Sequence, residues 1–140
     1  KYKDLLNLDY VEMENLKREI QSQSILFKSD TNVPTKGQFE KMEVLAGQMR
    51  RLVDLSKILK VQAKISIHGH TDQSGTAERN KNLSQQRAER IMEFLVSRGV
   101  PIDLFSLEAL GATKPISHEN TEPGLELNRR VAFEVAISQK

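Results

Sequence analysis

The segment from Val61 to Gly99 constrains the fold most strongly, because a strand-like and a helix-like hydrophobic period follow each other within it. The first part alternates apolar with polar residues, which is the period of a strand with one buried face: Val61, Ala63, Ile65 and Ile67. The last part repeats apolar residues every three or four positions: Ala88, Ile91, Met92 and Leu95. We therefore predict a strand at 61–68, a glycine-containing turn and a helix.

The start of this helix is placed at Leu83-Ser84, because Ser84 is a suitable N-cap residue. Gly99 supplies the left-handed residue that ends a helix, and Pro101 supports the same end. Arg87 then falls in the first helical turn, where the positive end of the helix dipole repels a cation. This placement predicts that an anion binds near Arg87.

Asp72 follows the predicted strand and should leave its carboxyl end with the carboxylate facing a cleft. Asp72 at a strand end and Arg87 at a helix start would together suit a ligand that carries one positive and one negative group. A simpler interpretation stays open, in which Asp72 only caps the turn by accepting a hydrogen bond from Ser74 or Gly75.

The N-terminal part reads as a helix that packs on the domain or on a partner. Residues 1–23 lack Gly and Pro and place apolar residues at near-heptad spacing: Leu6, Met13, Leu16 and Ile20. A short strand at 24–27 follows. Thr35 and Gln38 have the spacing of a capping box, which predicts a helix from there to about Lys57 with Phe39 in its apolar stripe.

The C-terminal part predicts two strands, at 104–110 and 131–138, separated by a turn-rich loop at 111–127. The order β-α-β-α-β-β favours an α/β (α+β) two-layer sandwich. In this fold two helices lie on one face of a mixed sheet, and an N-terminal helix is added. We expect residues 1–23 to form a helical connector and residues 24–140 to form the domain.

Composition excludes several classes of function. No apolar run approaches the roughly 20 residues of a membrane-spanning helix. A net charge of +2, with basic and acidic residues interspersed, argues against nucleic acid as a partner. The absence of cysteine excludes disulfides and thiolate metal sites. Because the chain begins at Lys1 without an initiator Met, we expect it to be a fragment of a longer protein.

A metal-dependent hydrolase is the competing interpretation of the turn. His68, His70 and Asp72 alternate along the chain, as zinc ligands can. The rest of such a site is missing, because only His118 remains as a further histidine and Gln73 stands where those enzymes carry another. We therefore predict no enzymatic activity, no catalytic residue, no metal and no cofactor.

A set of motifs carries a resemblance to a known family. Their order and spacing extend over more than a hundred residues: Ile65-x-Ile67-x-Gly69-His70-Thr71-Asp72, Gly75, Asn80, Leu83-Ser84, Arg87-Ala88, Gly99-Val100, Gly111, Pro115, Asn120-Thr121 and Asn128-Arg129-Arg130-Val131. From Ser24 to Ile137 the chain resembles the OmpA-like domain, the peptidoglycan-associating module of outer-membrane protein A, the lipoprotein Pal and flagellar stator subunits of the MotB type.

The resemblance implies noncovalent binding of peptidoglycan through the diaminopimelate residue of its stem peptide, which anchors a cell-envelope protein to the wall. Asp72 would accept hydrogen bonds from the ammonium of diaminopimelate, and Arg87 would bind its carboxylate. The resemblance adds four secondary ligand-binding residues: Thr71, Asn80, Leu83 and Arg129. Because adjacent residues at a strand start point to opposite faces, at most one of Arg129 and Arg130 should reach the site.

The resemblance also implies a location, in the periplasm of a Gram-negative bacterium, as part of a membrane-anchored envelope protein. Two departures from the family pattern keep an alternative open. Ala112 replaces an acidic residue, and Leu125-Glu126-Leu127 replaces the usual basic residue near Gly124. In that alternative the wall site is degenerate, and the domain binds other envelope proteins.

Overall fold

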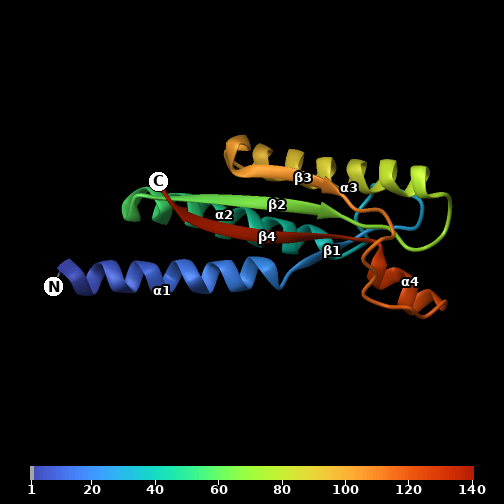
Figure 1. Ribbon diagram of the computed structural model, residues 1–140, viewed down its shortest axis with the longest axis horizontal. Coiled ribbons are helices and arrows are strands. Elements are labelled where there is room, and N and C mark those ends of the chain that lie inside the picture. The colour runs from blue at the N-terminus through green and yellow to red at the C-terminus, as the bar shows by residue number, and fades with distance from the viewer. Residues whose placement is uncertain (1) are drawn as a thin grey trace.

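The computed structural model describes residues 2–140, with side chains described from Asn7 onward. Its elements follow in chain order (Figure 1): α1 (Tyr2–Gln21), β1 (Ser24–Leu26), α2 (Gln38–Leu59), β2 (Val61–Gly69), α3 (Ala77–Ser97), the 3₁₀ turn η1 (Ile102–Leu104), β3 (Phe105–Ala109), α4 (Glu122–Asn128) and β4 (Arg130–Gln139). The predicted strands and the three longer helices are therefore present. The side chain of Leu6, expected in the apolar stripe of the first helix, lies outside the described residues.

The four strands form one mixed sheet in the order β1-β4-β2-β3. β2 lies in the centre, antiparallel to β4 and parallel to β3. The register pairs Gly69, at the end of β2, with Val131, at the start of β4. The residues that follow β2 therefore lie beside those that precede β4, although they are far apart in the sequence.

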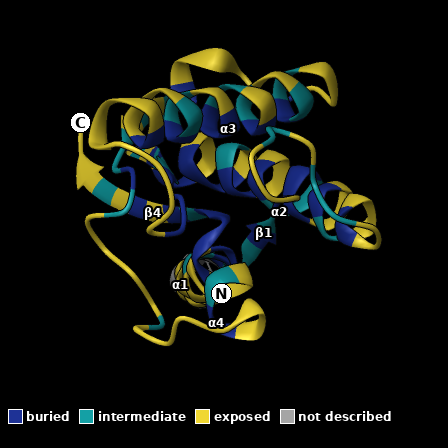
Figure 2. Cartoon of the chain, turned by 90° about the vertical axis from the view of Figure 1, so that its right-hand side faces the viewer, coloured by how far each residue is buried: buried dark blue, intermediate teal, exposed yellow. Residues whose placement is uncertain are grey.

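Helices α2 and α3 cover one face of this sheet, as predicted. In Figure 2 the exposed residues of α3 lie on its outer side, and its buried residues face the strands and α2. The alternation of β2 is also confirmed, because Ile65 and Ile67 are fully buried while Gln62 and Lys64 are exposed. The two-layer sandwich follows from the one-sided burial of the helices and the alternating burial of β2.

α1 packs on the domain and covers an open edge of the sheet. β1 pairs only with Arg130, Val131 and Ala132, which leaves the rest of that edge of β4 without a strand. Beyond β1, the backbone N–H of Val135 donates to Oε1 of Gln21 at 2.9 Å. The apolar residues of α1 join the main core: Met13, Leu16 and Ile20. A helix thus shields an edge that would otherwise be free to pair with another chain.

The predicted start of α3 is wrong. The helix begins at Ala77 with Thr76 as its N-cap, whose Oγ1 accepts from the N–H of Arg79 at 3.1 Å. The added first turns are mostly polar and exposed, so that no apolar period distinguishes them from a loop. Arg87 consequently lies in the middle of α3, and the argument from helix-dipole repulsion does not apply to it.

Two further predictions about helices are wrong. The capping box at Thr35 and Gln38 does not form, because Gly37 precedes α2 in a left-handed conformation and Oε1 of Gln38 accepts from the N–H of Leu26 at 3.0 Å. Phe39, expected in the buried stripe, is 56% exposed. The predicted loop at 111–127 contains the start of α4, whose Pro123 and Gly124 resemble turn signals in the sequence.

Within the described part of the chain, the helices are too short or too polar to cross a membrane.

Candidate ligand-binding site

The predicted site residues gather at the carboxyl end of β2, on the right in Figure 1. Thr71 and Asp72 follow β2, Arg87 comes from the middle of α3, and Arg129 stands between α4 and β4. The register of β2 and β4 explains why Asp72 meets Arg129 across 57 positions of sequence. The site is therefore assembled from three separate segments by the sheet.

Asp72 is 7% exposed, and both of its carboxylate oxygens have partners. Oδ1 accepts from the backbone N–H of Ser74 at 2.9 Å, which confirms the interpretation of Asp72 as a turn-capping residue. Oδ2 accepts from Nη1 of Arg129 at 3.1 Å. Turn capping fixes the orientation of the carboxylate and leaves a role in ligand binding open.

Arg129 bridges two carboxylates. Its Nη1 donates to Asp72, and its Nη2 donates to Glu122 in the first turn of α4. Burial lowers the pKa of the Arg129 guanidinium, but the hydrogen bonds with Glu122 and Asp72 raise it, and the net pKa lies above its ordinary value. Arg130 turns elsewhere and donates to the carbonyl of Lys114 at 3.1 Å. Of the two adjacent arginines, only Arg129 thus contacts Asp72.

Arg87 is the largest fully buried side chain of the described residues. Its guanidinium donates to three backbone carbonyls, those of Thr31 at 2.8 Å, His70 at 2.9 Å and Lys28 at 3.2 Å. It also lies 5.3 Å from the centre of the Phe27 ring. Burial lowers its pKa to about 10, so that it is still a cation at neutral pH.

The guanidinium of Arg87 has no carboxylate as a hydrogen-bond partner among the described side chains. Buried charges are normally paired, since removing a charge from water is costly. Three of its five N–H groups are engaged by carbonyls, which leaves two available. The nearby charges of Asp72 and Asp30 act to raise the pKa of Arg87, although neither carboxylate accepts a hydrogen bond from it.

The segment 28–33 covers Arg87 and bears on access to it. Its Asp30 has a left-handed backbone, with φ at 63°, and its carboxylate pairs with Arg79 of α3 at 2.8 Å. Beside this ion pair lies an open cleft of about 360 Å³, lined by Asp30, Thr76, Glu78, Arg79, Asn82, Leu83 and Gln86. Leu83, predicted as a ligand contact, is thus part of the cleft wall.

Thr71 and Asn80 lie on the other side of α3 from this cleft. Thr71 is buried, and its N–H donates to the carbonyl of Gly111 at 2.9 Å. Asn80 is also buried and borders a second, more apolar depression of about 520 Å³. That depression is lined by Ala77, Asn80, Lys81, Ala109, Leu110, Gly111, Ala112 and Thr113. The structure therefore places Leu83 and Asn80 in the walls of two different hollows, and neither wall includes Asp72 or Arg87.

Several residues that position the site were not identified from the sequence in this role. Gly69 is one, because a Cβ built there would lie 1.9 Å from the carbonyl oxygen of Ser84, so that β2 and α3 approach each other closely. Ser84, expected as an N-cap, instead accepts from the N–H of Gly111 at 3.0 Å. Glu122, the second partner of Arg129, had no signal in the sequence.

Asn128 braces the loop before α4. Its Oδ1 accepts from the N–H groups of Ile116 and Ser117, and its Nδ2 donates to the carbonyl of Ser117. The position of α4, and with it that of Arg129 and Glu122, depends on this loop.

The histidines of the turn are divided between different environments. His70 is 3% exposed, and burial, followed by the charges of Arg130, His68 and Lys114, lowers its pKa to about 3. His68 is half-buried on β2, where its Nε2 is 3.0 Å from Oγ of Ser66 and its ring centre is 6.4 Å from that of His70. The part of the chain that the structure describes holds no cluster of three His, Cys, Asp or Glu side chains arranged to bind a metal ion.

Known proteins resemble this domain in sequence. A family model described as the OmpA family matches residues 38–129. A peptidoglycan-associated lipoprotein of Buchnera aphidicola is 35% identical over 94 residues, which cover 66% of this chain and 54% of that protein. Outer membrane protein A of Bordetella avium is 36% identical over 93 residues, which cover 66% of this chain and 44% of that protein.

A solved structure extends the similarity to three dimensions. The crystal structure of the peptidoglycan-associated lipoprotein from Burkholderia pseudomallei matches with a TM-score of 0.70 and 26% identity, over 82% of this chain and 91% of that one. The chain spans about half the length of the two curated relatives that it matches.

Proposed function

The chain belongs to the OmpA family, and from this premise we propose that it binds peptidoglycan noncovalently and holds a cell-envelope protein to the cell wall. The names of its relatives, which include peptidoglycan-associated lipoproteins, support this function. They also support a location in the periplasm of a Gram-negative bacterium. The observation that carries the proposal is the buried Arg87 cation, which has hydrogen bonds to carbonyls but none to a carboxylate.

The ligand group that we propose is the free end of diaminopimelate, which carries an ammonium and a carboxylate on one carbon. The carboxylate would bind the two available N–H groups of Arg87, and the ammonium would donate to Asp72. Because Arg87 is fully buried beneath the segment 28–33, this segment has to move aside as the ligand enters. Leu83 would contact the ligand from the cleft wall, with Thr71 and Asn80 as supporting residues.

Arg129 makes it possible for Asp72 to exchange partners. Arg129 pairs with both Asp72 and Glu122. When the ligand ammonium replaces Arg129 beside Asp72, Arg129 remains paired with Glu122. Each charged group therefore keeps a partner of opposite charge. Each charged hydrogen bond contributes about 1.5–3 kcal/mol, against ordering costs of similar size. The affinity for a single site should therefore be weak and should increase when many copies act along the polymer.

The test is binding to purified sacculi. Wild-type protein should sediment with sacculi that contain diaminopimelate, and Asp72→Ala should lose most of this binding. Glu134→Ala is the matched control, because Glu134 is an exposed carboxylate on β4. Sacculi with lysine in place of diaminopimelate keep the ammonium and lack the carboxylate. They should bind at least about 10-fold more weakly, as expected for one lost charged hydrogen bond.

Other outcomes would identify the alternatives. If Asp72→Ala sedimented as wild type does, the site assignment would be wrong. Equal binding to both kinds of sacculi would exclude diaminopimelate as the recognised group. Release of soluble fragments from the sacculi would contradict the proposal that the domain binds without catalysis. An absence of any sedimentation would favour another envelope protein as the partner.

A further inference from the structure

Two further hollows follow the cleft at Asp30 and Arg79 along α3. The first has a volume of about 150 Å³ and is lined by Asn32, Gln86, Glu89, Arg90 and Glu93. The next has a volume of about 310 Å³ and is lined by Pro34, Thr35, Lys36, Gly37, Phe39, Met42, Arg90 and Phe94. Gln86 borders the cleft and the first of these hollows, and Arg90 borders both hollows. The three hollows are therefore neighbours in one row, which we call the groove.

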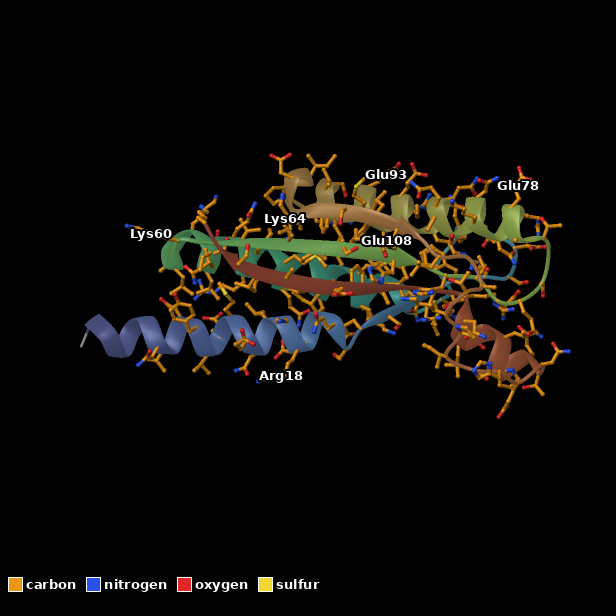
Figure 3. All side chains as sticks on the ribbon, in the orientation of Figure 1. Arg18, Lys60, Lys64, Glu78, Glu93 and Glu108 are labelled. Atoms are coloured by element: carbon orange, nitrogen blue, oxygen red, sulfur yellow. The ribbon has the colours of Figure 1, made fainter. Side chains whose placement is uncertain are left out.

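The walls of this groove are α3 on one side and the segment 30–39 on the other. Figure 3 labels Glu78 and Glu93, which border the first and second hollows and mark the course of α3 beside them. The segment 30–39 overlaps the segment 28–33 that covers Arg87 and includes Thr31, whose carbonyl accepts from Arg87. The groove and the candidate site therefore share this loop.

An aromatic pair lies at the far end of the groove, with Phe39 exposed and Phe94 half-buried. The rings of Phe39 and Phe94 meet edge to face, with 5.5 Å between their centres. The Arg98 guanidinium lies over both rings, 4.5 Å from the centre of Phe94 and 5.8 Å from that of Phe39, and is itself held by Glu43 at 2.6 Å. A ring that is 56% exposed but fixed on two sides is a preformed contact surface.

The polar groups between the cleft and this pair indicate the kind of ligand. Asn32 and Gln86 carry amides, Glu89 and Glu93 carry carboxylates, and Arg90 carries a guanidinium. Such a mixture offers donors and acceptors without one dominant charge, which suits a neutral ligand rich in hydroxyl and amide groups. An aromatic surface beside polar groups fits the less polar face of a pyranose ring.

We propose that this groove binds the sugar chain of peptidoglycan, with one N-acetylated sugar ring packed on Phe39 and Phe94. This inference rests on the proposed function and extends it from the stem peptide to the glycan. The distance agrees with it, since Arg87 and Phe94 are about 10 Å apart along α3 at about 1.5 Å per residue. An extended chain of about three residues covers the same distance. A stem peptide held at Arg87 can therefore place its sugar at Phe39.

The test is isothermal titration with two ligands, a disaccharide carrying its stem peptide and the same stem peptide without sugar. Phe39→Ala should weaken binding of the disaccharide ligand about 5-fold, which is within the range of one aromatic contact, and leave the sugar-free peptide unchanged. Arg90→Gln should have an effect in the same direction. Val44→Ala, an equally exposed apolar truncation on α2, should change neither affinity.

Equal affinities of wild type and Phe39→Ala for the disaccharide ligand would overturn the inference, and so would an equal loss for both ligands. Failure of the proposed function is distinguishable, because then neither ligand binds to the wild type. In that case chitotetraose, a sugar chain without any peptide, still tests the groove by NMR. Shifts of the Phe39 and Phe94 ring protons would support it, and unchanged ring protons would exclude it.

Discussion

Asp72 and Arg129 form a buried ion pair, with 3.1 Å between Oδ2 and Nη1, although the sequence predicted Asp72 as a ligand contact together with Arg87 and gave Arg129 only a secondary role. Both side chains are at least 90% buried. Asp72 is thus neutralised by Arg129, while the hydrogen bonds of the buried cation Arg87 all go to backbone carbonyls.

The Asp72–Arg129 pair should contribute to folding stability. Arg129→Gln leaves the buried Asp72 carboxylate without its cation, and such a loss typically costs about 3 kcal/mol or more. Asp72→Asn should cost less, because Arg129 keeps Glu122 as a partner, and the double variant should be less destabilised than the sum of the two. Urea denaturation in a double-mutant cycle measures this coupling, which we expect to be about 1–3 kcal/mol. Additive effects would show that the interaction between Asp72 and Arg129 does not contribute to the free energy of unfolding.

Arg87→Glu should unfold the domain. The substituted carboxylate would lie in a fully buried position against carbonyl oxygens, which repel it and donate no hydrogen bond. Arg87→Lys keeps the charge and can donate to the same carbonyls, so the domain should fold with a loss of about 2–3 kcal/mol. Circular dichroism during thermal unfolding distinguishes the two variants. A folded Arg87→Glu protein would contradict the described contacts of Arg87.

Gly69→Ala should destabilise the domain by about 3 kcal/mol, because its Cβ would overlap the backbone of Ser84 in α3. Gly47→Ala is the matched control. Gly47 lies inside α2, where a Cβ would meet only the end of the Arg50 side chain at 3.7 Å. There the higher helix propensity of alanine should stabilise the protein by up to about 1 kcal/mol. Chemical denaturation of both variants should show opposite signs.

His70 should make the domain sensitive to acid. Its pKa is about 3 in the folded protein and near 6.5 in the unfolded chain. Between these two pH values His70 is protonated in the unfolded state but neutral in the folded state. This contribution to stability is complete above pH 6.5. It falls by about 1.4 kcal/mol per pH unit as the pH decreases toward 3.

The measurement for His70 is the free energy of unfolding at pH 7, 5.5 and 4.5, for the wild type and for His70→Gln. Carboxylates also lose stability in acid, and both proteins share that loss. The wild type should therefore show the steeper decline. Parallel curves would mean that His70 is protonated in the folded protein.

Much of the fold could be predicted because its signals are local. The alternation in β2 and the apolar face of the later part of α3 can be recognised within short windows, and both are confirmed. The start of α3 could not be recognised. Its first turns are held by the Thr76 cap and the left-handed Gly75 and have no apolar period to mark them as helical.

The partners of the site residues were harder to predict than their positions. Arg87 binds backbone carbonyls, and any residue type can supply a carbonyl, so its contacts with Lys28 and Thr31 leave no pattern in the sequence. The pairing of Asp72 with Arg129 depends on the register of β2 and β4. Register is set by the whole sheet, which the motifs around the two residues do not encode.

The position of α1 determines how the domain would respond to mechanical force. Figure 1 shows that α1 lies along the long axis, with its N-terminal end far from the carboxyl end of β2. A pull on that end, against a ligand held at Arg87, would run parallel to the axis of the helix. The contacts of Met13, Leu16 and Ile20 and the Glu12–Arg51 pair would then be loaded together in shear. Shear loads many contacts at once, whereas peeling breaks them one at a time, so we expect a pull along α1 to meet more resistance than a pull across it.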